Sequence, residues 1–521
     1  MRRKKRLFNV AGPCNYQDHY MVPMVERHPE VEELIEQKQY FIIHSPRQTG
    51  KTTLVQELVN KIRKEDHYYP LYCSLESVEV FTEPERGITE IFHNLKFSIS
   101  YSSIPQKDLY GKDLDKSEYS TLIKKSLSDF CSKLDKPLIL FIDEIDCLSD
   151  KTLLSFIRQL RNGYITRNEI PFPHSIALIG MRNIRDFKFQ IREKRETLGT
   201  ASPFNIIKRD LTIDQFTIKE IHNLYSQHTE DTGQIFTDSL VQKIFENTGG
   251  QPWLVNAIAN EIVEDILKND VSKTIEADMV DIAIQNIILR RDTHIDSLLD
   301  KLQEQRVINV IQPLIIGGKG NIEILHEDTQ YCLNLGLIRM DKELGLVPAN
   351  NIYKEIIIRT LNYQTQYDLS LEVKNEWIKE DGHIDMNGLL KEFQVFWRLN
   401  SGIWEDKYLY KEAAPHLVLN AFLQRVINGG GHIAREYAYA RGRMDLCVQY
   451  KNKNYPIEIK LLYNKNTIQE GFEQLSNYLD GLGEKRGWLV IFDRDPNKTW
   501  EEKISQNTVK YKGYEINLLT C

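Results

Sequence analysis

A loop of small and polar residues, SPRQTGKT at 45–52, follows an apolar run and precedes a segment with apolar residues at helical spacing. It matches the pattern GxxxxGK(S/T) except at its first position, where Ser45 replaces glycine. In this pattern backbone N–H groups at a helix N-terminus surround phosphate, the lysine contacts the β- and γ-phosphates, and the hydroxyl binds Mg²⁺. Lys51 and Thr52 are therefore predicted to bind a nucleoside triphosphate with Mg²⁺, and Gly50 lets the backbone pass close to phosphate.

A pair of acidic residues ends a second apolar run. In PLILFIDEIDCL, the run 139–142 precedes Asp143 and Glu144. A continuous apolar run is typical of a buried parallel strand, and ligands bind at the carboxyl ends of such strands. Asp143 is predicted to support Mg²⁺ and Glu144 to polarise the attacking water. The alternative, that the two acids only begin a helix, is weaker beside a phosphate-binding loop.

Two further segments carry candidates for contact with a γ-phosphate. A third apolar run ends in Arg182 and Asn183, and a polar residue at this place often contacts that phosphate in this class of ATPase. We assign the contact to Asn183, with Arg182 as the open alternative. The preceding helical segment carries Arg158 and Arg161, either of which would serve as an arginine finger toward a neighbouring subunit. The alternative, that both are solvated helix arginines, stays open.

The segment 201–270 has helical patterns and contains TGGQPWLVNAIANEI, in which Gly249-Gly250 ends one helix and Pro252 starts the next. This resembles the lid of AAA+ ATPases related to origin-recognition and STAND proteins, and residues 1–265 as a whole resemble the AAA-like ATPase family. The resemblance depends on Asp143-Glu144, on GGQP, and on Pro46, Arg47, Gln48, Thr49, Gly50, Lys51, Thr52 and Thr53. It implies an α/β P-loop fold with a helical lid, and ATP with Mg²⁺ as the ligands.

The middle of the chain is expected to be a connector. Residues 271–362 have helical spacing followed by LGLIRM and GLVPAN, which would form the two strands of a winged helix. Winged helices follow AAA+ lids in many DNA-binding ATPases. The candidate recognition helix carries Glu327 and Asp328, so a packing or relay role is favoured over sequence reading. Residues 363–404 are expected to form a helical linker with an aromatic stripe.

Charged residues interrupt a hydrophobic hairpin in the last third. Within 442–462, Asp445 lies on the first expected strand, and Glu458 and Lys460 share one face of the second. A neighbouring strand would place Asp445 beside them. Burying three charges only as an ion-pair network is costly, which favours a functional site.

The flanking elements complete an αβββαβ order. A helix carrying Glu412 precedes the strands, and a helix carrying Gln474 and Tyr478 follows them; these two residues are four apart and so face the same way. This order, with D…ExK and QxxxY, resembles the PD-(D/E)XK nuclease superfamily over residues 405–521, and the branch that includes RecB-type nucleases in particular.

The resemblance implies metal-dependent hydrolysis of phosphodiesters. Mg²⁺ or Mn²⁺ would be bound by Asp445, Glu458 and the carbonyl of Ile459, because hard cations prefer oxygen ligands. Lys460 would position the nucleophilic water and stabilise the transition state.

The helices would supply the remaining side chains of this site. Glu412 would complete the metal shell through water, with Glu436 as a rival for that place. Gln474 and Tyr478 would orient the site or the DNA backbone. A fold of this kind that binds DNA without cutting it is the main alternative.

Composition limits the other possibilities. A chain of 521 residues is too long to fold around a single hydrophobic core. The expected parts are 1–200 ATPase core, 201–270 lid, 271–362 connector, 363–404 linker and 405–521 nuclease domain.

The net charge of −7 gives no global attraction to nucleic acid. The seven cysteines form no CxxC pair, which argues against a disulfide framework or a zinc site and fits a reducing cytoplasm. No apolar run is long enough to span a bilayer, so no membrane association is expected.

Taken together, these features predict a cytoplasmic ATP-regulated nuclease that acts on DNA, with RNA left open, and that forms a homo-oligomer through its ATPase domain. Defence against phage or mobile elements is the expected context, by analogy. Two alternatives remain: a nucleotide-switched DNA-binding scaffold, and a repair ATPase that trims DNA ends.

Overall fold

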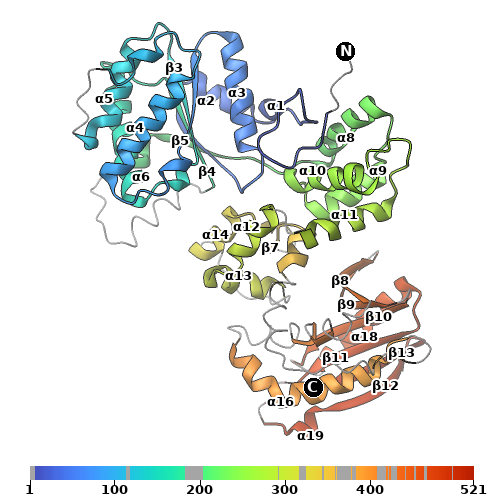
Figure 1. The fold of residues 1–521 in the computed structure, drawn as a ribbon. Coiled ribbons are helices and arrows are strands. Elements are labelled where there is room, and N and C mark those ends of the chain that lie inside the picture. Colours follow the sequence, from blue (N-terminus) through green and yellow to red (C-terminus); the bar gives the residue numbers. More distant parts are fainter. Residues whose placement is uncertain are drawn as a thin grey trace. The chain divides into compact units, whose positions relative to one another are not determined.

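The computed structural model of the chain describes residues 6–112, 118–181, 203–290, 293–315, 326–342, 345–357, 383–407, 431–439, 442–450, 453–462, 466–493 and 497–521, with a few single positions between them. It divides into two compact units. Unit 1 is Met1–Leu298 with Glu323–Ile352, and unit 2 is Leu299–Ile322 with Tyr353–Cys521. Each unit is described by itself (Figure 1).

Unit 1 contains a five-stranded parallel sheet in the order β2-β3-β4-β1-β5. Its strands are β1 (Tyr40–His44), β2 (Tyr69–Ser74), β3 (Leu138–Asp143), β4 (Ser175–Gly180) and β5 (Ile207–Thr212). All residues of β3 and β4 are buried, because helices cover both faces of these apolar strands. The parallel α/β sheet predicted from the apolar runs is confirmed.

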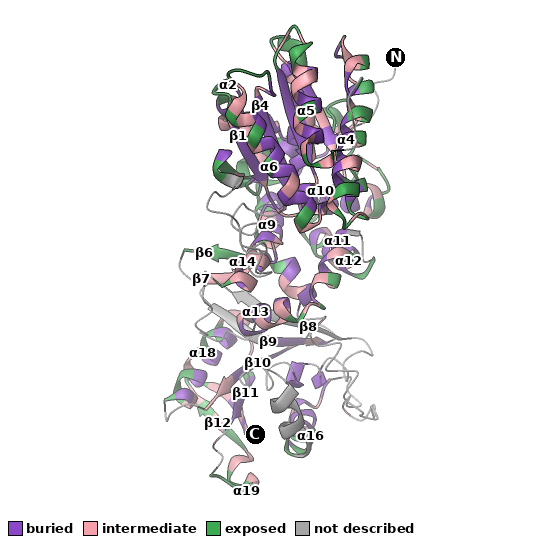
Figure 2. Cartoon of the chain, turned by 90° about the vertical axis from the view of Figure 1, so that its left-hand side faces the viewer, coloured by how far each residue is buried: buried purple, intermediate pink, exposed green. Residues whose placement is uncertain are grey.

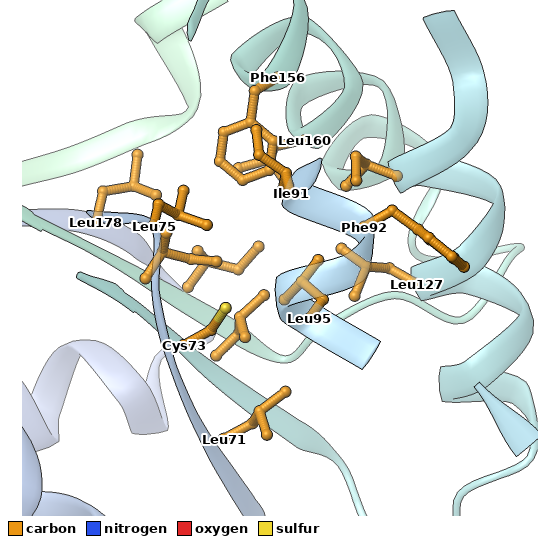
Figure 3. Packing of buried hydrophobic residues seen from close by; sticks show 14 of the residues in the cluster. Leu71, Cys73, Leu75, Ile91, Phe92, Leu95, Leu127, Phe156, Leu160 and Leu178 are labelled. Atoms are coloured by element: carbon orange, nitrogen blue, oxygen red, sulfur yellow. The ribbon is translucent and has the colours of Figure 1, made fainter. Parts of the chain in front are cut away.

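Helices pack on the two faces of this sheet, with α4, α5 and α6 on one side and α2 and α3 on the other (Figure 1). The bounds of the helices before and beside the sheet are α1 (Met24–Arg27), α2 (Pro29–Glu36), α3 (Lys51–Glu65), η1 (Glu76–Val78), α4 (Pro84–Ser100), η2 (Lys107–Leu109), α5 (Tyr119–Ser132), η3 (Ile145–Cys147), α6 (Asp150–Thr166) and η4 (Pro203–Ile206). A large core lies between β2, β3 and helices α4–α6, where Leu71 and Cys73 of β2 belong to the same buried cluster as Phe92 and Leu95 of α4 (Figure 3).

Helices follow the sheet as the lid pattern predicts. They are α8 (Ile218–Thr232), α9 (Asp238–Thr248), α10 (Pro252–Asn260), the π-helical turn η5 (Glu261–Ile266) and α11 (Ala277–Arg290). Thr217 and Glu220 form a capping box at the start of α8. Gly249 adopts φ +58° and ends α9, and Pro252 occupies the first turn of α10.

The segment after the lid is shared between the two units. It comprises α12 (Thr293–Lys301), α13 (Gln305–Ile315), α14 (Glu327–Asn334), β6 (Ile338–Asp341) and β7 (Gly345–Pro348). The two strands pair in antiparallel fashion, as the expected hairpin requires. The division between units falls inside α12 and separates α13 from α14 and the hairpin. The winged-helix arrangement of the whole segment therefore stays a prediction.

Unit 2 contains a six-stranded mixed sheet in the order β12-β13-β11-β10-β9-β8. Its strands are β8 (Gly431–Tyr439), β9 (Gly442–Tyr450), β10 (Lys453–Leu461), β11 (Arg486–Phe492), β12 (Ser505–Tyr511) and β13 (Tyr514–Thr520), and its helices are α16 (Met386–Lys407), α18 (Thr467–Leu482) and α19 (Trp500–Lys503). Strand β10 pairs antiparallel with β9 and parallel with β11. The part β8–β10, α18, β11 of the expected order is present, whereas the expected helix that carries Glu412 is not covered by the described residues. Helix α16 falls almost entirely in the segment expected to be a helical linker, and the β12–β13 hairpin is an addition that the sequence did not reveal.

The two faces of this sheet are covered by different helices. Phe393 of α16 and Ile457 of β10 belong to one apolar cluster, whereas Leu475 of α18 and Leu489 of β11 belong to another. Figure 2 shows buried residues along the strands and on the inner sides of the helices that the structure describes. Within those described residues, no helix has the length and apolarity needed to cross a membrane.

Candidate functional site

The phosphate-binding loop connects β1 to α3 at the carboxyl edge of the sheet. Gly50 adopts φ +98°, a conformation that suits glycine and strains other residues. The hydroxyl of Thr49 donates a hydrogen bond to the carbonyl of Pro46 (2.9 Å), which closes the loop on itself. The loop therefore has the compact form that its sequence pattern predicts.

Lys51 is the first residue of α3 and is only 8% exposed. Its ammonium group donates to the carbonyl oxygens of Ser45 (2.8 Å) and Pro46 (2.7 Å). Burial lowers the pKa of Lys51, and Glu144 and Asp143 oppose that shift. A buried ammonium group that is held by carbonyls favours binding of an anion in this loop.

Asp143 ends β3 and is 1% exposed. Its Oδ2 atom accepts hydrogen bonds from the hydroxyls of Thr52 (3.0 Å) and Tyr72 (2.9 Å), and its Oδ1 atom accepts from the N–H of Glu144 (2.9 Å). The structure thus brings together Thr52 and Asp143, which are far apart in the sequence. Sequence reasoning missed Tyr72, because a tyrosine in an apolar strand is ordinarily core.

Glu144 follows directly and adopts φ +56°, which is unusual for a residue other than glycine. Burial raises its pKa, with a further contribution from the neighbouring charge of Asp143. A carboxyl group held in a strained conformation beside the phosphate loop is suited to accept a proton from water.

Asp146 lies at this edge, whereas the candidate arginines lie along α6, and Asn205, the partner of Arg161, directly precedes the amino end of β5. The carboxylate of Asp146 accepts a hydrogen bond from the N–H of Met181, directly after β4. Arg158 is exposed on α6, and Arg161 donates to the side chain of Asn205 (2.8 Å). Asn183 and its alternative Arg182 lie outside the described residues.

A pocket of about 630 Å³, part of it open to solvent, adjoins the phosphate loop. Its walls come from three parts of unit 1: the N-terminal segment 9–24, loop residues 48–53, and lid residues that include Phe216 and Trp253. The indole N–H of Trp253 donates to the carbonyl of Val10 (2.9 Å), and the hydroxyl of Thr53 accepts from the N–H of Cys14 (3.2 Å). The N-terminal segment therefore joins the lid to the loop, which no motif in the sequence indicated.

Three other segments of unit 1 contact loop residues 46–48. The side chain of Gln251 donates to the carbonyl of Gln48 (3.3 Å), and Arg47 donates to the hydroxyl of Ser297 on α12 (3.2 Å). A Cβ atom at Gly336, between α14 and β6, would lie 2.6 Å from the Cγ atom of Pro46, so the backbone at Gly336 lies directly against the ring of Pro46.

The second candidate cluster lies on β10 in unit 2. Glu458 is 2% exposed, and its Oε1 atom is 2.7 Å from the ammonium group of Lys460. These two residues pair with Leu489 and Ile491 of β11, whose side chains belong to the apolar cluster under α18. The ExK pair is thus an ion pair on the sheet face that α18 covers.

The antiparallel register of β9 and β10 pairs Cys447 with Pro456 and Leu446 with Ile457. Continued by one residue, this register would place Asp445 opposite Glu458, although the side chain of Asp445 is outside the described set. Within that set, no three His, Cys, Asp or Glu side chains gather as a metal-binding group.

The other predicted residues of this site differ in their surroundings. Ile459 is buried in the cluster on the α16 face. On α18, Tyr478 is buried against Cys447, whereas Gln474 is exposed. Glu412 lies outside the described residues, and so does the side chain of Glu436.

A family model described as an AAA-like domain matches residues 15–358, more than half of the chain. The chain belongs to the AAA-like domain family. This family implies ATP as the nucleotide of the P-loop, typically with Mg²⁺. A second model, described as a domain of unknown function (DUF8371), matches residues 393–495, which contain the Glu458–Lys460 pair.

Several solved structures resemble the chain at low identity. A Walker-type ATPase of Pyrococcus abyssi is 12% identical with a TM-score of 0.48, over 67% of this chain and 99% of that one. Cdc6p of Pyrobaculum aerophilum is 13% identical with a TM-score of 0.37, over 68% and 97%. A RuvB Holliday junction branch migration motor of Thermotoga maritima is 15% identical with a TM-score of 0.34, over 64% and 93%. Among curated proteins, none matches this sequence.

Proposed function

We propose that unit 1 of this AAA-like protein binds ATP with Mg²⁺ and hydrolyses it. The observation that carries this proposal is the 3.0 Å hydrogen bond between Thr52 and Asp143, beside the buried Lys51. A hydroxyl and a carboxylate are the oxygen ligands that Mg²⁺ prefers near phosphates, so the residues present fit the ion. Mg²⁺ would neutralise charge on the phosphates.

In this proposal each residue has a separate role. Lys51 leaves the loop carbonyls to contact the phosphates, and Asp143 supports the ion together with Thr52. Glu144 orients the attacking water and accepts its proton. The pocket walled by Phe216 and Trp253 takes the base, because aromatic and apolar side chains favour a flat ring.

Glu144→Gln tests the hydrolytic step. The amide keeps the size of the side chain but cannot accept a proton, so phosphate release is expected to fall about 100-fold while ATP affinity changes little. Phosphate release and equilibrium binding of ATP are the two measurements. Glu36→Gln, at an exposed position of α2, is the control and should behave as wild type. Equal hydrolysis by Glu144→Gln and wild type would contradict the role of Glu144.

We propose in addition that unit 2 hydrolyses phosphodiester bonds of DNA with a divalent metal ion. This proposal is supported by the Glu458–Lys460 ion pair, which is largely buried on β10, an inner strand of the sheet. A buried carboxylate with a lysine two residues away suits a hard cation and a water nucleophile. Asp445, on the facing strand, would be the second carboxylate ligand; Mg²⁺ or Mn²⁺ would satisfy this oxygen set.

We propose finally that the nucleotide state of unit 1 controls this activity. Support comes from the contacts of Ser297 and Gly336 with loop residues 46–47, because α12 continues from Leu298 directly into unit 2. A shift of the loop would thus displace α12, the segment that leads to the proposed nuclease site. DNA as substrate, assembly through the ATPase domain and a role in defence belong to the same proposal, by family resemblance.

Gly336→Ala tests the contact between Gly336 and Pro46, on which this proposed control depends. The added methyl group would displace Pro46, whose ring is rigid, and the misplaced loop is expected to slow ATP hydrolysis about tenfold. Gly345→Ala is a matched control, because Gly345 also has positive φ (+77°) but has no atom within 4 Å of an added Cβ. Both variants should lose similar stability from backbone strain, about 1 kcal/mol. If both slow hydrolysis equally, the contact with Pro46 has no part in function.

A further inference from the structure

Asp143 accepts a hydrogen bond from a residue that belongs to neither nucleotide motif. Tyr72 lies on β2, which pairs in parallel with β3, so that Tyr72 is opposite Phe141 and Ser74 is opposite Asp143. Leu71 and Cys73 point to the core under α4, and alternation along the strand turns Tyr72 to the opposite face. That face is the one on which α3 begins with Lys51 and Thr52.

The hydroxyls of Tyr72 and Thr52 share one atom of the carboxylate, Asp143 Oδ2, at 2.9 and 3.0 Å. The two donors differ in how freely their hydroxyl groups can turn away from the carboxylate. Thr52 can rotate its hydroxyl toward an ion, whereas the phenol of Tyr72 is attached to a rigid strand. A phenol carries an O–H group and a carboxylate only accepts, so Tyr72 is the donor in this hydrogen bond.

We propose that Tyr72 is a positioning residue for the Mg²⁺ that accompanies the nucleotide. Its hydroxyl holds the Asp143 carboxylate in one rotamer, with a free lone pair directed to the ion, when Thr52 turns away to bind that ion. Hydrogen-bond partners of this kind orient ligands of metal sites and contribute to metal affinity. The inference rests on the proposed ATP-binding function of unit 1 and adds a residue to it.

The test is the Mg²⁺-dependent part of nucleotide affinity. Binding of ADP to the full chain is measured by calorimetry with Mg²⁺ and again with a chelator, in wild type and in Tyr72→Phe. The factor by which Mg²⁺ raises the affinity for ADP is expected to be about tenfold smaller in the variant than in wild type. Without Mg²⁺, the variant and wild type are expected to bind ADP equally.

A matched control lies on the same strand. The hydroxyl of Tyr69 donates to Asp135 at 2.9 Å, so Tyr69→Phe removes the same kind of bond away from the site. It should leave the Mg²⁺-dependent gain unchanged. An equal loss in both variants, or a loss in Tyr72→Phe that is the same with and without Mg²⁺, would assign Tyr72 a merely structural role. If wild type gains nothing from Mg²⁺, the proposed function itself fails together with this inference.

Discussion

Lys51→Met is expected to weaken binding of ATP by about 100-fold and to abolish hydrolysis. The ammonium group of Lys51 is buried and donates to the carbonyls of Ser45 and Pro46 in the hydrogen bonds described above, so an anionic phosphate in the loop would be a favourable partner for its charge. Loss of charge-assisted hydrogen bonds to phosphate costs about 3 kcal/mol, which corresponds to that factor. Equilibrium binding and phosphate release measure the two effects.

Lys51→Met should weaken ATP binding but should leave the stability of the fold unchanged or raise it. The folded-state pKa of Lys51 lies below its ordinary value, so the protonated form destabilises the fold at every pH below that pKa, and the effect disappears as pH rises past the ordinary value. Methionine keeps the side-chain stem without the charge. The unfolding temperature of Lys51→Met at neutral pH is therefore expected to equal or exceed that of wild type.

Lys61→Met is the control for this prediction. Lys61 lies on the same helix, is half exposed, and pairs with Glu32 at the surface at 2.5 Å. Surface pairs of this kind contribute little to stability, so this variant should bind and hydrolyse ATP as wild type does. Wild-type ATP affinity in Lys51→Met would contradict the assignment of the P-loop.

Lys460→Ala is expected to reduce DNA cleavage by about 100-fold to 1000-fold. Lys460 is the cation within 2.7 Å of the buried Glu458, and in the proposed mechanism it stabilises charge that develops on the phosphate. Removing one preorganised donor of this kind typically costs that factor in turnover. The initial rate of plasmid cleavage with Mg²⁺ or Mn²⁺ is the measurement.

Lys453→Ala provides a matched control on the same strand, because Lys453 begins β10 and is exposed. It should cleave DNA at the wild-type rate. Glu458→Gln should lose cleavage as Lys460→Ala does, since the amide no longer offers a charged ligand to the metal ion. Undiminished cleavage by both active-site variants would exclude the Glu458–Lys460 pair as the catalytic site.

Local patterns were enough to predict that the loop 45–52 and Asp143 lie at the same edge of the sheet. The loop 45–52 and the pair Asp143-Glu144 each follow an apolar strand, and parallel strands bring their carboxyl ends to one edge. The hydrogen bond between Thr52 and Asp143 is the physical consequence of that rule. In the same way, the ExK spacing alone places Glu458 and Lys460 on one face of a strand.

Contacts between distant segments were beyond the reach of these patterns. Tyr72 could not be distinguished from a core tyrosine until the neighbouring strand fixed which face it occupies. The N-terminal wall of the pocket, the contact of Gly336 with Pro46, and the β12–β13 hairpin likewise depend on tertiary packing. Local spacing carries no information about such pairings.

The most direct test of the whole account is plasmid cleavage by the full-length chain with Mg²⁺, in the presence and absence of ATP. Wild type is compared with Lys51→Met and Lys460→Ala. We expect cleavage that requires ATP in wild type and that is lost in both variants, because Lys51→Met weakens binding of the nucleotide and Lys460→Ala removes the ammonium group from the proposed nuclease site. Cleavage that is independent of ATP and unchanged in Lys51→Met, or no cleavage by wild type under any nucleotide condition, would contradict it.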